Sequence, residues 1–273
     1  MWKGANNIAV VALLLGGNAC TDKTNDGASS LLDEAKSSVS IADYSRAITL
    51  LDSIHKAFPD AFDQRQEAYS LRNEVDYKKT IADKQLTDSL LVDEQIRLDS
   101  ILHYFKKVDS PELFRPYFIY KSLPAGSIIL RSGIEPRVTD EGNMTMISSV
   151  VGRNVMHTSV SLISQNGASA STDDIPFDGE QNFRENGSEL ITYTASQCQA
   201  LADFAAIHQN EKLSLRFNGK QSLTLPISES EIKALYLSSK LAKTTISIDK
   251  LRRDSILLER KLQVVRDFNA RKH

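Results

Sequence analysis

The sequence predicts an α+β protein in which a mostly antiparallel β-domain is inserted between two long helices. Two stretches, residues 76–106 and 231–268, carry apolar residues at helical spacing. The stretch between them, residues 117–226, is rich in β-branched residues, Ser and Gly, and its apolar residues alternate as they do in strands. Of the 273 residues, 41% are hydrophobic and 25% are charged, as in soluble globular proteins.

The chain begins with the layout of an export signal. Lys3 gives a short basic start, the apolar run Ile8–Leu15 follows, and small and polar residues then lead to Cys20. The run is too short for a transmembrane helix, which needs about 20 apolar residues. The sequence therefore predicts a signal peptide over residues 1–20 and an exported protein.

The small residues before Cys20 resemble the lipobox of bacterial lipoproteins of the Bacteroides type. This resemblance implies that Cys20 is the lipid attachment residue and that the mature protein is anchored to a membrane of the cell envelope, facing the periplasm or the cell surface. Two or more acyl chains hold a protein stably on a membrane. Two alternatives stay open: cleavage after Gly17-Asn18-Ala19 would give a soluble exported protein, and the apolar run would be a buried helix in a cytosolic one.

Residues 21–28 are polar and lack apolar periodicity, which predicts a flexible tether. Residues 29–75 have helical spacing, with small alanines where two helices can approach and a proline that ends the second helix. The pattern is carried by Ala35, Tyr44, Ala47, Leu51, Ile54 and Pro59. It resembles a tetratricopeptide repeat, which implies a protein-docking hairpin. A generic helical hairpin is the alternative, because only one repeat is visible.

Two stem helices are predicted on either side of the β-domain. The first covers residues 76–110, with Phe105 on its apolar heptad frame and a break at Ser110-Pro111. The second covers residues 228–273 and opens with the capping-box signature Ser228-x-x-Glu231. Its heptad seam consists of Leu237, Leu241, Thr244, Ile248, Leu251, Ser255, Leu258, Leu262 and Val265. Because neither helix can leave its apolar stripe in water, we expect an antiparallel, coiled-coil-like stem within one chain. Pairing of the last helix in a dimer, or with another protein, is the alternative.

The β-domain is predicted over residues 111–227. One helix interrupts it, opened by Thr194-x-x-Gln197 and burying Cys198. Asn218-Gly219 between alternating runs predicts a hairpin turn, and the polar residues 165–188 predict a long loop. The predicted strands are Ser127–Arg131, Met144–Val151, Val155–Ser164, Glu189–Tyr193, Lys212–Phe217 and Ser222–Ile227.

No catalytic, cofactor-binding or metal-ligand motif is recognisable. The five histidines have no metal-ligand spacing, and Asp173, Asp174 and Asp178 do not match a calcium loop. Phosphate-loop, G-x-S-x-G and H-E-x-x-H motifs are absent from the sequence. His157 is expected on the exposed face of a strand, with Ser159 and Ser161. Loop charges that would form a polar surface are Arg131, Arg137, Asp140, Glu141 and Arg153.

These observations favour a non-catalytic envelope lipoprotein that presents a β-domain on a stem to a protein or glycan partner. The net charge of −2 argues against nucleic acid. The alternatives are an envelope hydrolase with a site built from β-domain loops and an oligomeric scaffold built through the coiled coil. Asp-Ser-aliphatic tripeptides resemble the O-glycosylation acceptor of exported Bacteroides proteins, although amphipathic helices also produce this composition; their serines are Ser53, Ser89, Ser100 and Ser255.

Overall fold

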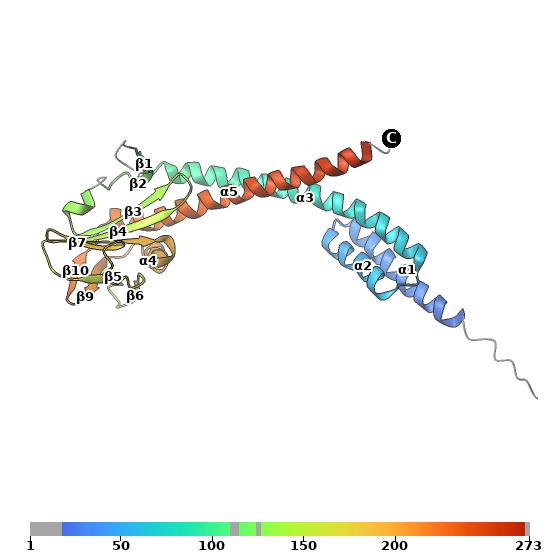
Figure 1. Cartoon of the computed structure of the whole chain (residues 1–273), viewed down its shortest axis with the longest axis horizontal. Coiled ribbons are helices and arrows are strands. Elements are labelled where there is room, and N and C mark those ends of the chain that lie inside the picture. Colours follow the sequence, from blue (N-terminus) through green and yellow to red (C-terminus); the bar gives the residue numbers. More distant parts are fainter. Residues whose placement is uncertain (1–17, 110–114, 124–126, 271–273) are drawn as a thin grey trace, which may run out of the picture. The chain divides into compact units, whose positions relative to one another are not determined.

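The computed structural model describes residues 18–109, 115–123 and 127–270 (Figure 1). Over these residues the protein is α+β, with five helices and two antiparallel sheets. The chain divides into two compact units, one formed by residues up to 86 together with residues from 255 onward, and one formed by residues 87–254. The expected break at Ser110-Pro111 lies outside the described residues.

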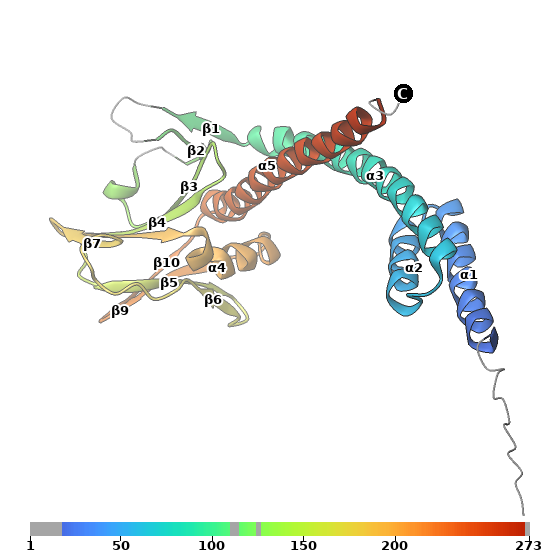
Figure 2. The same ribbon diagram turned by 45° about the vertical axis from the view of Figure 1, so that its right-hand side comes forward.

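The first unit is built on three N-terminal helical segments. These are α1 (Asn18–Ser40), α2 (Tyr44–Ala57) and the first part of α3 (Phe62–Leu102). Helices α1 and α2 pack on each other (Figure 2), and Ala35 and Ala47 are fully buried in their shared core, as their small size predicts. The other buried residues of this core are Ala28, Leu32, Leu51, Ile54, Ala61, Ala68 and Val75.

Helix α1 begins earlier than expected. Residues 21–28, predicted as a polar tether, are part of this helix. The reason is visible at Ala28, which is fully buried in the core of the first unit, so the packed face of α1 extends back into the polar segment.

Helix α3 also differs from expectation at both ends. It runs without interruption through residue 76, where the first stem helix was predicted to begin, and it ends at Leu102. Phe105, placed by the heptad frame on this helix, lies instead in β1 (Phe105–Val108), opposite Tyr120 of the next strand. Its side chain is buried in the core of the second unit, as an apolar residue requires, but it reaches this core from a strand and not from a helical turn.

The second unit contains both sheets, and every neighbouring pair of strands is antiparallel. In spatial order, the six-stranded sheet is β1, β2 (Tyr117–Tyr120), β3 (Gly133–Thr139), β4 (Met144–Val151), β8 (Ser188–Thr194) and β7 (Asn182–Glu185). The four-stranded sheet is β10 (Ser222–Pro226), β9 (Leu213–Gly219), β5 (His157–Ser164) and β6 (Ser169–Ser171).

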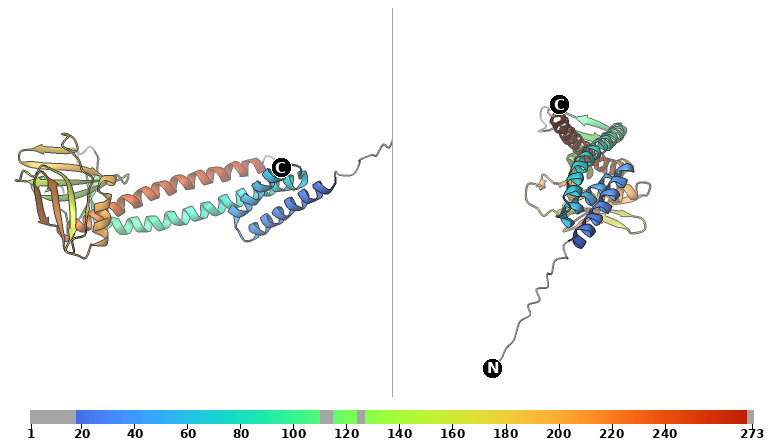
Figure 3. Two further views of the ribbon diagram at one scale, coloured as in Figure 1. Left: turned by 90° about the horizontal axis from the view of Figure 1, so that it is seen from below. Right: turned by 90° about the vertical axis from the view of Figure 1, so that its right-hand side faces the viewer.

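The two sheets lie face to face (Figure 3) and share one hydrophobic core. Met146 and Tyr193 from the six-stranded sheet and Leu162 and Phe217 from the four-stranded sheet are fully buried in it. Helix α4 (Ala195–Ile207) adds Cys198, Leu201, Ala202 and Ala205, the face predicted from the sequence. The expected capping residue is in place, because the Thr194 N–H donates to Oε1 of Gln197 at 2.8 Å.

Two expectations within the β-domain were wrong. Residues 127–131 form a 3₁₀ turn, η1 (Ser127–Leu130), instead of a strand; only Ile128 of its apolar residues is buried, whereas Ile129 and Leu130 are exposed. The predicted loop 165–188 contains β6 and β7. These short edge strands consist mainly of polar and small residues, so they lack the apolar alternation by which strands are recognised.

Helix α5 (Glu229–Ala270) begins where the capping box predicts. The Glu231 N–H donates to Oγ of Ser228 at 3.2 Å, and the Glu231 carboxylate accepts from the Ser228 N–H at 3.2 Å. The same carboxylate accepts from Nη1 of Arg131 at 2.6 Å and from the Ile134 N–H at 3.3 Å. One side chain therefore caps the helix and joins it to β3.

The β9–β10 hairpin is present, but Gly219 has a different role from the one predicted. Asn218 pairs with Ser222, so the connection runs through Gly219, Lys220 and Gln221. Gly219 also pairs with His157 of β5, and a Cβ at this position would lie 2.6 Å from the carbonyl oxygen of Val155. Glycine is required here because two backbones approach closely.

We therefore expect Gly219→Ala to lower the free energy of unfolding by about 2–4 kcal/mol, because the methyl group must displace the backbone of Val155 and Met156, just before β5. Urea unfolding followed by circular dichroism measures the change. Gly167→Ala is the matched control, since its added Cβ meets open space and only its φ of +87° is unfavourable. It should cost about 1 kcal/mol. Equal losses in the two variants would contradict the close-approach argument.

Candidate functional site

A β-bulge at the start of β5 turns His157 into the protein interior. His157 pairs with Gly219 and Ser159 pairs with Asn218, so one extra residue separates these pairs on β5. The extra residue reverses the alternation, which puts His157 on the same face as Val160 and Leu162. His157 is 0% exposed. The expectation of an exposed-face histidine was wrong, because alternation was continued through the bulge.

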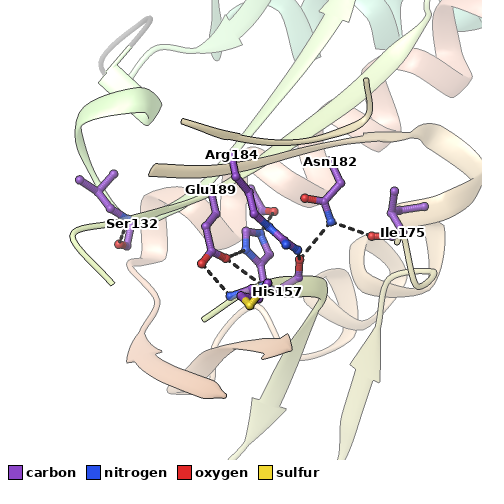
Figure 4. A network of polar contacts seen from close by, with 9 residues as sticks. Ser132, His157, Ile175, Asn182, Arg184 and Glu189 are labelled. Carbon is purple, nitrogen blue, oxygen red and sulfur yellow. Dashed lines mark hydrogen bonds and ion pairs between the residues drawn. The ribbon is translucent and has the colours of Figure 1, made fainter. Parts of the chain in front are cut away.

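His157 lies between a serine and a carboxylate. Its Nδ1 is 2.7 Å from Oε2 of Glu189 (Figure 4), and its Nε2 is 2.9 Å from Oγ of Ser148. Ser148 and Glu189 come from β4 and β8 of the six-stranded sheet, whereas His157 comes from the four-stranded sheet. The Ser148–His157–Glu189 series thus connects the two sheets by hydrogen bonds.

The Glu189 carboxylate also fixes the backbone that leads into β5. It accepts from the Met156 N–H at 2.6 Å and from the His157 N–H at 2.8 Å. Met156 has a φ of +55°, a left-handed conformation that costs a non-glycine residue about 1 kcal/mol. The charge-assisted hydrogen bond at its N–H offsets this cost.

The protonation states follow from these surroundings. Burial lowers the pKa of His157, although the hydrogen bond and charge of Glu189 oppose this effect. Burial alone would raise the pKa of Glu189, but hydrogen bonds from the His157 ring and from two backbone N–H groups lower it below its usual value. At neutral pH, Nδ1 of a neutral His157 therefore donates to the Glu189 carboxylate. Nε2 is left to accept from the Ser148 hydroxyl.

This order of groups is the one that activates a serine in acyl-transfer enzymes. Ser148 and His157 are both 0% exposed, however, and Glu189 is only 4% exposed. A substrate carbonyl would have to reach Ser148 through the packed core. In this conformation the three side chains are sealed in the interior, and their hydrogen bonds hold the two sheets together.

Two further side chains from β7 converge on His157 (Figure 4). Nδ2 of Asn182 donates to the carbonyl oxygens of His157, at 3.1 Å, and Ile175, at 2.8 Å. Nη2 of Arg184 lies 3.4 Å from the His157 carbonyl oxygen. The guanidinium of Arg184 also lies over the ring of Phe177, 4.9 Å from its centroid.

Two open pockets adjoin this network and share Arg184. The first, here the Gly152 pocket, has a volume of about 500 Å³. It is lined by Gly152, Arg153, Asn154, Arg184, Glu185, Asn186, Gly187, Ser188 and Glu189. The second, the Phe177 pocket, has a volume of about 400 Å³. It is lined by Met156, Thr158, Ser159, Asp174, Pro176, Phe177, Arg184, Asn218, Gly219 and Lys220.

The other residues singled out from the sequence are spread over the fold. Cys20 falls within α1, but its side chain is outside the described part of the structure. Cys198 is fully buried, and burial raises the pKa of its thiol to about 12, as expected for a structural cysteine. Of the loop charges expected to form a polar surface, Arg131 pairs with Glu231 and Arg137 with Glu135, whereas Arg153 lines a pocket.

Two absences hold for the described residues alone. No group of three or more His, Cys, Asp or Glu side chains there is placed to hold a metal ion. No helix there has the length and apolar character needed to cross a membrane.

Sequence reasoning missed Ser148 and Glu189, although a signal for both was present. Glu189 occupies the inward position of its strand, in alternation with the buried Ile191 and Tyr193. Ser148 alternates in the same way with Met146 and Val150. A polar residue at an inward position of an alternating strand indicates a buried hydrogen-bonded group, because a buried polar group without a partner is costly.

The buried histidine predicts a pH-dependent stability. A histidine in the unfolded chain binds a proton near pH 6.5, whereas folded His157, with its lowered pKa, stays neutral to a lower pH. The unfolded state therefore binds more protons below about pH 6.5, and the free energy of unfolding falls as the pH is lowered, by up to about 1.4 kcal/mol per unit. Glu189, whose pKa is also lowered, adds a further loss below about pH 4.5.

Urea titrations at a series of pH values measure this slope. His157→Gln should flatten it between about pH 6.5 and 5.5, because the group that titrates there has been removed. His103→Gln is the matched control, because it also removes one histidine, but an exposed one outside the Ser148–His157–Glu189 series. The flattening should be larger in His157→Gln than in this control. An unchanged slope in His157→Gln would show that another group causes the pH dependence.

The candidate site thus combines a sealed Ser148–His157–Glu189 series with two open pockets that meet at Arg184. The pockets lie at the surface, where a ligand can enter. The sealed series lies beneath them and links β4, β5 and β8 by hydrogen bonds. Comparison of the chain with protein-family models, with curated proteins and with solved structures finds no match.

Proposed function

We propose that the protein is an envelope lipoprotein, anchored through Cys20, whose β-domain is a non-catalytic module that binds a protein or a glycan. The observation that carries this proposal is the pairing of two open pockets with a sealed polar network beneath them. A recognition site needs side chains held in place by a rigid support. His157 and Glu189 supply that support, because they fix the strands from which the pocket side chains project.

Several contacts favour the helical parts of this proposal. The small residues of the tetratricopeptide-like pattern are buried where α1 and α2 meet, which suits a docking hairpin. Each of the nine seam residues of α5 is buried or half-buried, as in a packed stem. In the first unit Nζ of Lys84 lies 3.8 Å from Oε2 of Glu259, and in the second Nη2 of Arg252 lies 3.4 Å from Oε1 of Gln95. Lys84 precedes Gln95 along α3, whereas Glu259, the partner of Lys84, follows Arg252 along α5. This reversed order is typical of two antiparallel helices.

The anchor is tested by palmitate labelling and membrane fractionation of the full chain. We expect label in the wild type and none in Cys20→Ala, which should also leave the membrane fraction, because one thiol carries the anchor. Cys198→Ala is the matched control, since it removes the chain's other cysteine and should keep both the label and the membrane association. Label retained by Cys20→Ala would contradict anchoring at this residue.

A second candidate, an envelope serine hydrolase, is favoured by one specific observation. The Ser148–His157–Glu189 series has the hydrogen-bond order and spacing of a nucleophile, a general base and an orienting carboxylate. For this activity the sheets would have to open far enough for a substrate carbonyl to reach Oγ of Ser148.

A fluorophosphonate probe separates the two candidates, because it labels only a serine that is both activated and accessible. The binding proposal expects no labelling of the wild type. Labelling that is lost in Ser148→Ala but kept in Ser149→Ala would establish the hydrolase instead. Ser149 is a suitable control because it is the neighbouring buried serine on β4 and lies outside the series.

A further inference from the structure

Arg184 carries a charge that the fold does not neutralise. It lies directly opposite Glu189 on the neighbouring strand, a position from which arginine and glutamate commonly pair. The Glu189 carboxylate is already bound by His157 and by two backbone N–H groups. Among the described residues, Arg184 has no ion pair, and its Nε is buried without a hydrogen-bond partner.

The guanidinium of Arg184 is nevertheless held in place. It lies over the Phe177 ring, and Nη2 faces the His157 carbonyl oxygen. Because the group is planar and offers donors in a fixed fork, it matches a carboxylate with two parallel hydrogen bonds. Little side-chain freedom is left to lose on binding, since the stacking already limits it.

The charges around Arg184 are mixed rather than uniformly basic. Arg153 lines the Gly152 pocket and Lys220 lines the Phe177 pocket, and neither forms an ion pair with another described residue. Glu185 and Asp174 line the same two pockets. This mixture suits a ligand that carries one acidic group together with hydrogen-bonding hydroxyls, and it disfavours a uniformly charged polyanion.

The rest of the Phe177 pocket has the character of a sugar-binding surface. Thr158 and Ser159 supply hydroxyl groups, which can both donate and accept hydrogen bonds. Asn218, whose Nδ2 already donates to Oγ of Ser161 at 2.8 Å, supplies its amide oxygen as an acceptor. Phe177 is 57% exposed beside Pro176, which provides an apolar face for the C–H side of a sugar ring. A pocket with an apolar wall and a few placed polar groups is typical of small-ligand sites.

We propose that the two pockets together bind an acidic saccharide, with a uronate carboxylate paired to Arg184 and an adjoining sugar ring on Phe177. This inference rests on the proposed binding function of the β-domain and specifies its ligand class. Arg153 in the Gly152 pocket and Lys220 in the Phe177 pocket each add a further positive charge.

Isothermal titration calorimetry of the full chain in detergent tests the proposal, with disaccharides that each carry one galacturonate, mannuronate or glucuronate unit joined to a neutral sugar as probes. Neutral galacto-oligosaccharide of the same length and an oligoglutamate peptide are the comparison ligands. At least one uronate should bind at least about tenfold more tightly than either comparison ligand, because a bidentate charged hydrogen bond to the guanidinium is worth that factor or more.

Four variants locate the site. Arg184→Gln should weaken uronate binding at least about tenfold, and Arg184→Lys should weaken it as well, because lysine keeps the charge but loses the fork. Arg216→Gln is the matched control, since Arg216 is an exposed arginine on β9 outside both pockets, and it should bind like the wild type. Lys220→Gln, at an exposed position, should weaken binding several-fold without a loss of thermal stability.

The proposal is overturned if no uronate binds at millimolar concentration, or if the neutral oligosaccharide binds as tightly as the uronates. Preferred binding of oligoglutamate would also overturn it and would point to a protein partner. These results are distinct from failure of the proposed function itself, which would show as fluorophosphonate labelling of Ser148.

Discussion

The carboxylate of Glu189 is the contact on which the β-domain depends. It stands in the six-stranded sheet and accepts three hydrogen bonds from Met156 and His157 of the segment that starts the other sheet. Without it, two backbone N–H groups and an imidazole N–H would be buried with no acceptor, at a cost of several kcal/mol. The bulge in β5, the inward turn of His157 and the left-handed Met156 all depend on this one acceptor.

The same carboxylate also affects the charge at the surface of the β-domain. Because Glu189 is committed to the interior, its neighbour across the strand pair, Arg184, is left to face the two pockets without an acidic partner among the described residues. The buried hydrogen-bond network and the proposed binding site at the surface therefore share a cause. Substitutions of Glu189 would alter both, whereas substitutions of Arg184 act chiefly on the surface.

Much of the architecture could be predicted from local patterns. Apolar spacing and two capping boxes located α4 and α5, and alternation located β4, β5, β8, β9 and β10. The failures arose where tertiary contacts decide the structure. Phe105 fits the heptad frame of a helix but is buried on a strand, and β6 and β7 are stabilised by their partners instead of by their own composition. The site was missed because the bulge is fixed by Glu189, which is 32 residues away from His157 in the sequence.

The buried thiol of Cys198 has a practical consequence. It lies on the inner face of α4, in the core between the two sheets, and burial raises its pKa to about 12. A thiol reacts as the thiolate, so the native protein should resist oxidants and alkylating reagents at this position. Modification becomes possible when α4 or a sheet moves away from this core. The rate of alkylation at Cys198 is therefore a built-in reporter of transient opening of the β-domain under native conditions.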